Sequence, residues 1–332
     1  MKDKKITIEQ IAEKAGVSVA TVSRAYNHPE KVRKSTLENI RLSIKELKFA
    51  NVSDVSEPSS KAALIIVNLP KIGNPFYSDI LQGIRNSADL HHYHVLINHD
   101  SLNPSSAEMF CIMLKTVQAA GVLTLGYLDQ EVLEKINYIT PVVQCCEFNR
   151  EAALPYVSID DYAAACSAVE YLIASGKQKI AFLSGPQHCK YASERYRGFC
   201  DTMKKHGLSF PSAWVSFLPD INYDMAFSAA GQILSSSLKP DAFFTSSDIQ
   251  AAGVVRAALK KGLSIPEELS VIGFDNINLS SIMVPTITTV NQPKFQIGFA
   301  AGELLHETIM TPGLSYKTLL LDTELIIRES TL

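Results

Sequence analysis

From Ala62 to Pro285 the sequence alternates short apolar runs with amphipathic segments, and this alternation restricts the possible fold more than any other feature. Short runs rich in valine, isoleucine and phenylalanine between helical patterns are typical of parallel strands joined by crossover helices. The sequence therefore predicts an α/β fold with two parallel sheets and flanking helices. Strands are predicted at residues 62–69, 93–99, 121–127, 141–147, 156–160, 179–184, 213–218, 242–247 and 269–274.

The predicted body, residues 62–332, divides into two lobes. A new strand-helix cycle begins after Asp160, and the helix at 294–310 is expected to return to the first sheet before the chain crosses once more. The N-lobe is therefore expected at about 62–160 plus 291–318, and the C-lobe at about 161–288 plus 319–332. Such a two-lobed body, with three crossings, resembles a periplasmic sugar-binding protein that closes on a ligand between its lobes.

The first 49 residues carry a different pattern, in which residues 7–27 read as two short helices and a tight turn. Thr7 and Gln10 fit a capping box at the start of the first helix. Gly16 permits the sharp turn, and Ser18 can cap the second helix. A third helix follows, with apolar residues at helical spacing. The alternative is any small three-helix domain, but the joint pattern favours a DNA-reading helix-turn-helix.

The second helix of this headpiece is expected to bury Val22 and to expose small, hydroxyl-bearing and basic side chains. Hydroxyls suit phosphate contacts, small apolar groups suit a thymine methyl, and an arginine fork matches guanine. We therefore expect DNA contacts from Thr7, Ser18, Val19, Ala20, Thr21, Ser23, Arg24, Asn27 and Lys31.

Charge separates the headpiece from the body. Residues 1–50 hold 11 lysines and arginines against 6 acidic residues, whereas residues 51–332 hold 20 against 28. A basic head on an acidic body is expected of a phosphate-binding module joined to a domain that does not bind DNA. Residues 50–61, which are polar, serine-rich and broken by Pro58, are predicted to be a linker.

These motifs together resemble the lactose/galactose-repressor (LacI/GalR) family of bacterial transcription regulators. The resemblance is carried by residues 6–27 and by the blocks at 74–84, 182–199, 246–276 and 285–293, which occur in the family's order. Within the family, CEFN at 146–149 and DTELIIREST at 322–331 are most similar to the cytidine-repressor subgroup. Family members usually carry a hinge helix with a wedging leucine, and residues 50–60 lack these residues, so a flexible linker is expected here.

Ligands of open α/β sheets bind beyond the carboxyl ends of the strands, and polar residues at those ends are the candidates for effector contacts. Asn74, Phe76 and Tyr77 either cap a helix with a packed aromatic pair or offer a stacking surface, and the resemblance favours stacking by Phe76. Glu147 and Asp160 end their strands, where each could accept hydrogen bonds from a ligand or cap a helix.

The second lobe supplies further candidates. The resemblance places an effector-binding arginine at Arg195 and a cleft residue at Ser247, with Asp248 as the cap of its helix. Asp275 is the strongest acceptor candidate, because a carboxylate at a strand end can bind a diol with both oxygens. Gln292, on a crossing strand, is a minor candidate. Ile221 stands where relatives place an aromatic wall, with Tyr223 as a nearby substitute.

Composition restricts the remaining classes. No apolar run reaches the ~18 residues of a membrane span, and no export signal precedes the first helix, so a cytoplasmic protein is expected. The cysteines lack a C-x-x-C pair and are predicted to be reduced thiols, while the histidines at 91–99 are expected to bind no metal. No catalytic motif is present, which disfavours a sugar-converting enzyme. A transport binding protein would have no use for residues 7–48.

The sequence therefore predicts a ligand-responsive transcriptional regulator, with repression as the default sense. It is expected to bind a pseudo-palindromic operator as a homodimer under control of a small sugar or nucleoside. No cofactor is expected, and the sequence leaves open whether two dimers pair.

Overall fold

The computed structural model describes residues 8–19, 21, 22, 25, 32, 33, 35–37, 39, 40, 42, 43, 63–311 and 317–332. The chain forms two compact units, Met1–Ala62 and Ala63–Leu332.

The headpiece begins with helix α1 (Ile8–Ala15). Gly16 follows with a φ of 64°, and the amide of Val17 donates to the carbonyl of Ala12 over 3.0 Å, which ends the helix in a left-handed turn. Helical backbone resumes at residues 19–25 and 35–43, as far as those ranges are described. A small core joins these segments through Ile11, Ala12, Ala15, Val22 and Ile40. The predicted burial of Val22 is confirmed.

The second unit contains two sheets of six strands each. The first sheet has the order β11-β5-β4-β3-β1-β2, and all its pairings are parallel. Its strands are β1 (Leu64–Asn68), β2 (His94–Asn98), β3 (Gly121–Thr124), β4 (Val142–Cys145), β5 (Tyr156–Ile159) and β11 (Thr318–Leu321).

The second sheet has the order β12-β10-β9-β8-β6-β7, with β12 antiparallel to β10 and the other pairings parallel. Its strands are β6 (Ile180–Ser184), β7 (Val215–Phe217), β8 (Ala242–Thr245), β9 (Ser270–Asp275), β10 (Thr288–Asn291) and β12 (Glu324–Ile326). Strands β6, β8 and β9 are buried along their whole length, because helices cover both faces of the sheet.

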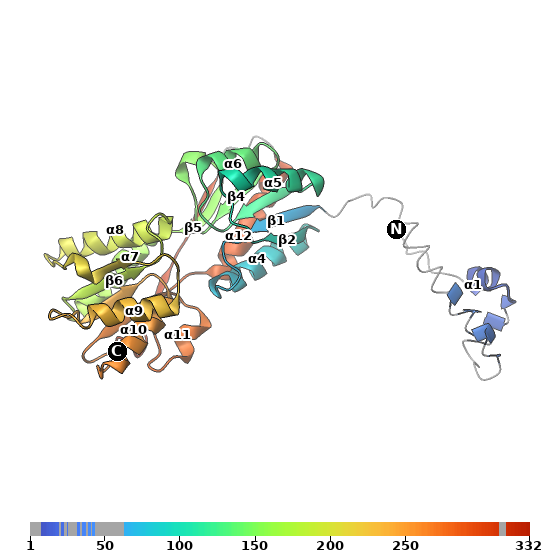
Figure 1. Ribbon diagram of the computed structural model, residues 1–332. Coiled ribbons are helices and arrows are strands. Elements are labelled where there is room, and N and C mark those ends of the chain that lie inside the picture. The colour runs from blue at the N-terminus through green and yellow to red at the C-terminus, as the bar shows by residue number, and fades with distance from the viewer. Residues whose placement is uncertain are drawn as a thin grey trace. The chain divides into compact units, whose positions relative to one another are not determined.

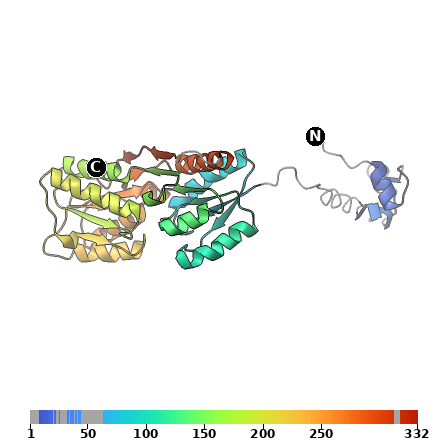
Figure 2. The ribbon, with the colours of Figure 1, turned by 90° about the horizontal axis from the view of Figure 1, so that it is seen from above.

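Helices cover both faces of each sheet (Figure 1). In the first lobe, α5 (Pro104–Thr116) and α6 (Gln130–Asn137) pack together on one face, and α4 (Phe76–Leu90) and α12 (Lys294–Met310) cover the other. The second lobe pairs α7 with α8 and α9 with α10, as Figure 2 shows from above. These helices are α7 (Asp161–Ala174), α8 (Lys190–Lys205), α9 (Tyr223–Ile233) and α10 (Asp248–Lys260). The short helix α11 spans Asn278–Ile282, and two 3-10 turns span Arg150–Ala152 and Ser212–Trp214.

Helices α4 and α12 approach each other closely enough to require glycine. A Cβ on Gly298 would lie 2.0 Å from the carbonyl oxygen of Ile80, and one on Gly83 would lie 2.1 Å from that of Phe295. Such distances leave no room for a methyl group, so the crossing depends on both glycines. This contact fixes a helix near the end of the chain onto the first helix of the body.

All nine predicted strands are present, and the helix expected at 294–310 packs on the first lobe. One crossing differs from expectation. Residues 318–321 form strand β11 of the first sheet, so the chain passes to the second sheet at residues 322 and 323 instead of before 319. The parallel pairing of β11 with β5 gives these apolar residues a partner that the sequence alone does not reveal. The six cysteines are free thiols, as expected.

Candidate functional site

A cavity of about 290 Å³ lies between the two lobes of the body, beyond the carboxyl ends of the parallel strands. Eight of the nine predicted effector-binding residues line it: Asn74, Phe76, Tyr77, Glu147, Arg195, Ser247, Asp275 and Gln292. Further lining residues that the sequence did not single out for this role include Lys71, Tyr127, Cys146, Asp161, His188, Cys189, Tyr191, Asp220 and Ser246.

Arg195, from the second turn of α8, is buried and held in place on several sides. Its Nε donates to Asp161 over 2.8 Å, and its Nη1 donates to the carbonyl of Ser246 over 2.6 Å. The guanidinium also stacks on the ring of Phe274, 3.4 Å from its centroid. A guanidinium has five N–H donors, so Arg195 keeps donors for a ligand although Asp161 balances its charge.

Asp161 holds a second cation, since Lys190 donates to its other carboxylate oxygen and reaches Ser158 over 2.9 Å. Burial alone would raise the pKa of Asp161, but Lys190 and Arg195 together hold that pKa below its usual value. Asp161 is therefore an ionised carboxylate whose hydrogen-bonding capacity is used by the protein.

Asp275 ends β9 in a backbone conformation with a φ of 102°, which few side chains adopt. Gln292 donates to its carboxylate over 2.8 Å, whereas Lys294 donates to its backbone carbonyl over 2.6 Å. Burial raises the pKa of Asp275 to about 7, although Arg195, Lys294 and Gln292 oppose this. Within the described residues, no cation forms an ion pair with this carboxylate. Asp275 thus offers acceptor capacity to a ligand.

Glu147, at the end of β4 in the first lobe, reaches across to the second lobe. Its two carboxylate oxygens accept the backbone amides of Lys190 over 2.7 Å and Tyr191 over 3.1 Å, at the start of α8. Burial raises the pKa of Glu147, while Lys190 and the two amides oppose that rise. The expected capping role is therefore confirmed, for a helix of the other lobe, and the expected contact with a ligand stays a prediction for a residue that lines the cavity.

Asp160 is placed differently from the other candidates. Its side chain is exposed and accepts the amide of Ala163 over 2.9 Å, so it caps α7 while Asp161 faces the cavity. Ser247 lines the cavity, as expected, and it also caps α10, whereas Asp248, which was expected to cap that helix, is buried between the amide of Ile277 and the hydroxyl of Thr289. Adjacent residues at a helix start point in different directions, and only tertiary contacts decide between them.

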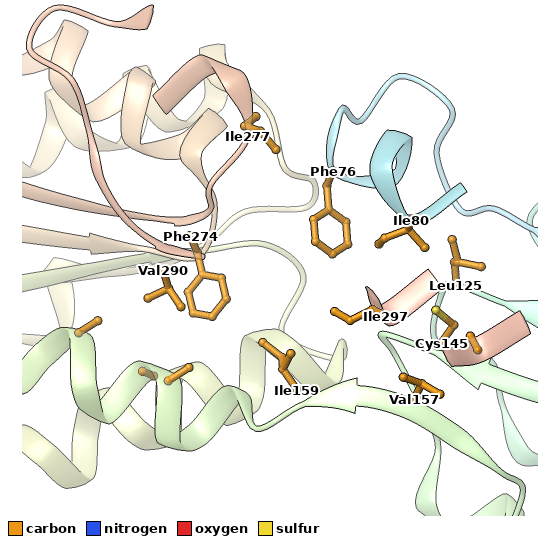
Figure 3. Packing of buried hydrophobic residues seen from close by; sticks show 14 of the residues in the cluster. Phe76, Ile80, Leu125, Cys145, Val157, Ile159, Phe274, Ile277, Val290 and Ile297 are labelled. Carbon is orange, nitrogen blue, oxygen red and sulfur yellow. The ribbon is translucent and has the colours of Figure 1, made fainter. Parts of the chain in front are cut away.

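Aromatic side chains form the apolar part of the cavity. Phe76 and Tyr77 come from the start of α4, where the Asn74 side chain accepts the amide of Phe76 over 3.1 Å. Figure 3 shows Phe76 of the first lobe and Phe274 and Ile277 of the second where the lobes meet. Tyr127 and Tyr191 add two further rings. Ile221 lines the cavity, but Tyr223 is not among the described lining residues, so it does not replace the missing aromatic wall.

Burial raises the pKa of Tyr77 well above its usual value, and it also raises the pKa of Tyr191. Both tyrosines are therefore neutral hydroxyls, able to donate and accept hydrogen bonds. Burial raises the pKa of the Cys189 thiol to about 12, so this cysteine is a neutral, unreactive group in the cavity wall.

Few sequence signals mark the cavity residues that were not predicted. Lys190 follows a turn and resembles a surface lysine, and Asp161 is one of two adjacent aspartates. Their roles arise because β4, β5 and α8 converge from different parts of the chain. A charged residue just inside a predicted helix, after a strand end, was the available signal.

The headpiece places three of its predicted DNA contacts within the described residues. The hydroxyl of Ser18 accepts the amide of Thr21 over 3.2 Å and lies 2.8 Å from the Thr21 hydroxyl, which is the expected helix cap. Val19 is 45% exposed while Val22 is fully buried. Thr7, Ala20, Ser23, Arg24, Asn27 and Lys31 lie outside the described residues.

The described residues offer neither a metal site nor a membrane span. Among the described residues, no group of three or more histidine, cysteine, aspartate or glutamate side chains is arranged to hold a metal ion. Within that same part of the chain, no helix is long and apolar enough to cross a membrane.

Comparison with known proteins gives concordant matches. The family "Bacterial regulatory proteins, lacI family" matches residues 7–51, and "Periplasmic binding protein-like domain" matches residues 169–331. The chain is 34% identical to the HTH-type transcriptional repressor CytR of Escherichia coli K12, over 98% of this chain and 96% of that protein. It is 31% identical to the ribose operon repressor of Halalkalibacterium halodurans, over 98% and 97%.

Among solved structures, the complex of the transcriptional regulator CelR with cellobiose matches with a TM-score of 0.75 and 26% identity, over 98% of this chain and 100% of that one. The lac repressor dimer bound to operator, at 23% identity and a TM-score of 0.77, shares the fold.

A helix-turn-helix headpiece on a two-lobed body with a ligand-sized cavity defines the class of ligand-responsive, DNA-binding transcriptional repressors. The chain belongs to the lacI family of bacterial regulatory proteins. Its relatives are transcriptional regulators, not enzymes.

Proposed function

We propose that this protein binds a pseudo-palindromic operator as a homodimer and that a small sugar or nucleoside in the interlobe cavity controls this binding. The observation that carries the proposal is the presence of both Asp275 and Arg195 in the lining of a cavity walled by aromatic rings. A carboxylate and a guanidinium with donors to spare suit hydroxyl groups, and rings suit the faces of sugars and bases.

The relatives support a sugar ligand and a dimer on DNA. The CelR structure holds cellobiose, a sugar, and the lac repressor structure is a dimer on its operator. Two copies of a helix-turn-helix related by a two-fold axis read two half-sites, which explains an operator with the same symmetry. The bacterial chromosome lies in the cytoplasm, where we place the protein's action.

The experiment couples the two activities. We would screen the full-length protein by thermal unfolding against pentoses, hexoses, disaccharides, nucleosides and purine bases. A ligand present at about 100 times its Kd should add about 2.7 kcal/mol to the free energy of unfolding. The same ligand should change the affinity for an operator selected from random DNA, as measured by gel shift.

Two variants serve as reciprocal controls. Asp275→Asn should lose ligand stabilisation and keep operator binding. Arg24→Ala should keep ligand stabilisation and lose about 1–3 kcal/mol of operator binding. A ligand that stabilises the protein without any effect on DNA binding would contradict the proposed control, and equal weakening of Arg24→Ala on random DNA would leave that residue only a phosphate contact.

A further inference from the structure

The start of α8 faces the cavity, and the protein places its own negative charge there. Cys189 precedes the helix and makes no side-chain cap, so the amides of Lys190 and Tyr191 are available to an acceptor. The start of a 16-residue helix is where a phosphate or carboxylate group of a ligand would ordinarily bind. Both amides are instead bonded to the carboxylate of Glu147, which is only 7% exposed.

The cations around the cavity are also committed to the protein. Asp161 holds Arg195 and Lys190, and the carbonyl of Ser246 takes a further donor of Arg195. Lys71 at the rim pairs with Asp220. Within the described part of the chain, each of these cations therefore already faces a carboxylate.

Carboxylates outnumber cations in the lining of the cavity. Four carboxylates line it, from Glu147, Asp161, Asp220 and Asp275, against two cations, Lys71 and Arg195, together with His188. Asp275 accepts a side-chain hydrogen bond from Gln292 and has a second oxygen toward which no described donor is directed. Asp275 therefore suits a ligand that brings donors, and a ligand that brings negative charge meets like charges.

We propose that Glu147 is a specificity-determining residue that makes the cavity select unphosphorylated ligands over their phosphorylated counterparts. The Glu147 carboxylate accepts the amides at the start of α8, so these amides cannot bind an anionic group of a ligand. Its negative charge also repels such a group at the same place. This inference rests on the proposed function, since it concerns the ligand of the same cavity. It assigns to the regulator the ability to sense a free sugar or nucleoside and to ignore the product of a kinase acting on it.

The test uses matched pairs of probes with the full-length protein: ribose and ribose phosphate, glucose and glucose phosphate, and each common ribonucleoside and its monophosphate. Calorimetric titration should show that the wild type prefers the neutral member of its pair by about a hundredfold or more, as expected for a dianion close to a carboxylate in a partly buried site. Glu147→Gln should reduce that preference by about tenfold or more, because it removes the repelling charge.

Two variants control for effects unrelated to charge at α8. Glu147→Asp keeps the negative charge and should keep the preference. Glu151→Gln removes a charge four residues further on, from an exposed side chain outside the cavity lining, and should also keep it. Thermal unfolding without ligand verifies that each variant is folded.

Inorganic phosphate gives a second readout that needs no sugar or nucleoside. It should stabilise Glu147→Gln against unfolding and leave the wild type unchanged. The inference is overturned if the wild type binds the neutral and the phosphorylated member of a pair with equal affinity. It is also overturned if Glu147→Gln shows the same ratio of affinities as the wild type and is not stabilised against unfolding by inorganic phosphate. If no member of any pair binds the wild type, the sugar or nucleoside assignment fails, and the inorganic phosphate result alone decides the role of Glu147.

Discussion

Asp248 and Asp275 lie close enough to repel each other, yet both are buried with few charges nearby to balance them. Burial raises the pKa of Asp248 to about 8, with the Asp275 charge as the next contribution, while bonds from Thr289 and Ile277 and the charge of Lys294 oppose this. Asp248 does not line the cavity, so its titration reports on the fold rather than on ligand binding.

This raised pKa predicts the pH dependence of stability. Between about pH 4 and pH 8 the native chain holds a proton on Asp248 that the unfolded chain releases, so the free energy of unfolding falls as pH rises through this window. Asp248→Asn imitates the protonated acid. In this variant the decrease in the free energy of unfolding over the same pH window should be smaller than in the wild type by about 1 kcal/mol or more. Denaturant unfolding at several pH values measures it, and parallel curves for the variant and the wild type would contradict the assignment.

At the scale of elements, the crossing of α4 and α12 leaves no room for added side-chain atoms. Gly298→Ala should lower the free energy of unfolding by about 1–3 kcal/mol or more, because its methyl group would meet the carbonyl oxygen of Ile80. Gly231→Ala in α9 is the matched control: a Cβ there meets nothing within 4 Å, and an alanine in a helix should add about 0.5–1 kcal/mol. Equal effects of the two substitutions in denaturant unfolding would refute this account of the crossing.

The elements were predictable from sequence because their signals are local. Buried parallel strands read as continuous apolar runs, and α12 shows an uninterrupted helical segment from Lys294 to Met310. The partners of these elements were less accessible. Glu147 was expected as a cap or a ligand contact, but the helix it caps lies in the other lobe, more than forty residues later. Asp161 was missed because its neighbour Asp160 has the same chemistry, and the convergence of β5 and α8 selects between them.

At the scale of the whole body, polar contacts connect the lobes at the cavity rim. The pair between Lys71 of the first lobe and Asp220 of the second has side chains that are 47% and 42% exposed. Exposed ion pairs contribute about 0.2–1 kcal/mol to stability. This contact should therefore make only a small contribution to the closure of the two lobes on a ligand.

Lys71→Ala should therefore weaken ligand binding by less than about fivefold, and the loss should shrink at high salt because exposed charges are screened. Lys135→Ala, which removes an exposed cation paired with Glu131 on α6, is the control and should leave ligand affinity unchanged. Titration calorimetry at low and high salt measures both variants. A loss for Lys71→Ala as large as that expected for Asp275→Asn would show that the pair decides closure.

The return of α12 and β11 to the first lobe has a consequence for synthesis of the protein. The first lobe cannot be completed when residue 160 leaves the ribosome, since α12, which covers one face of its sheet together with α4, begins at Lys294, and the edge strand β11 ends at Leu321. At about 5–20 residues per second, roughly ten to thirty seconds of translation separate the two events. During that interval the apolar surface that α12 covers in the finished lobe stays exposed on the nascent chain, where it is open to aggregation or to a chaperone.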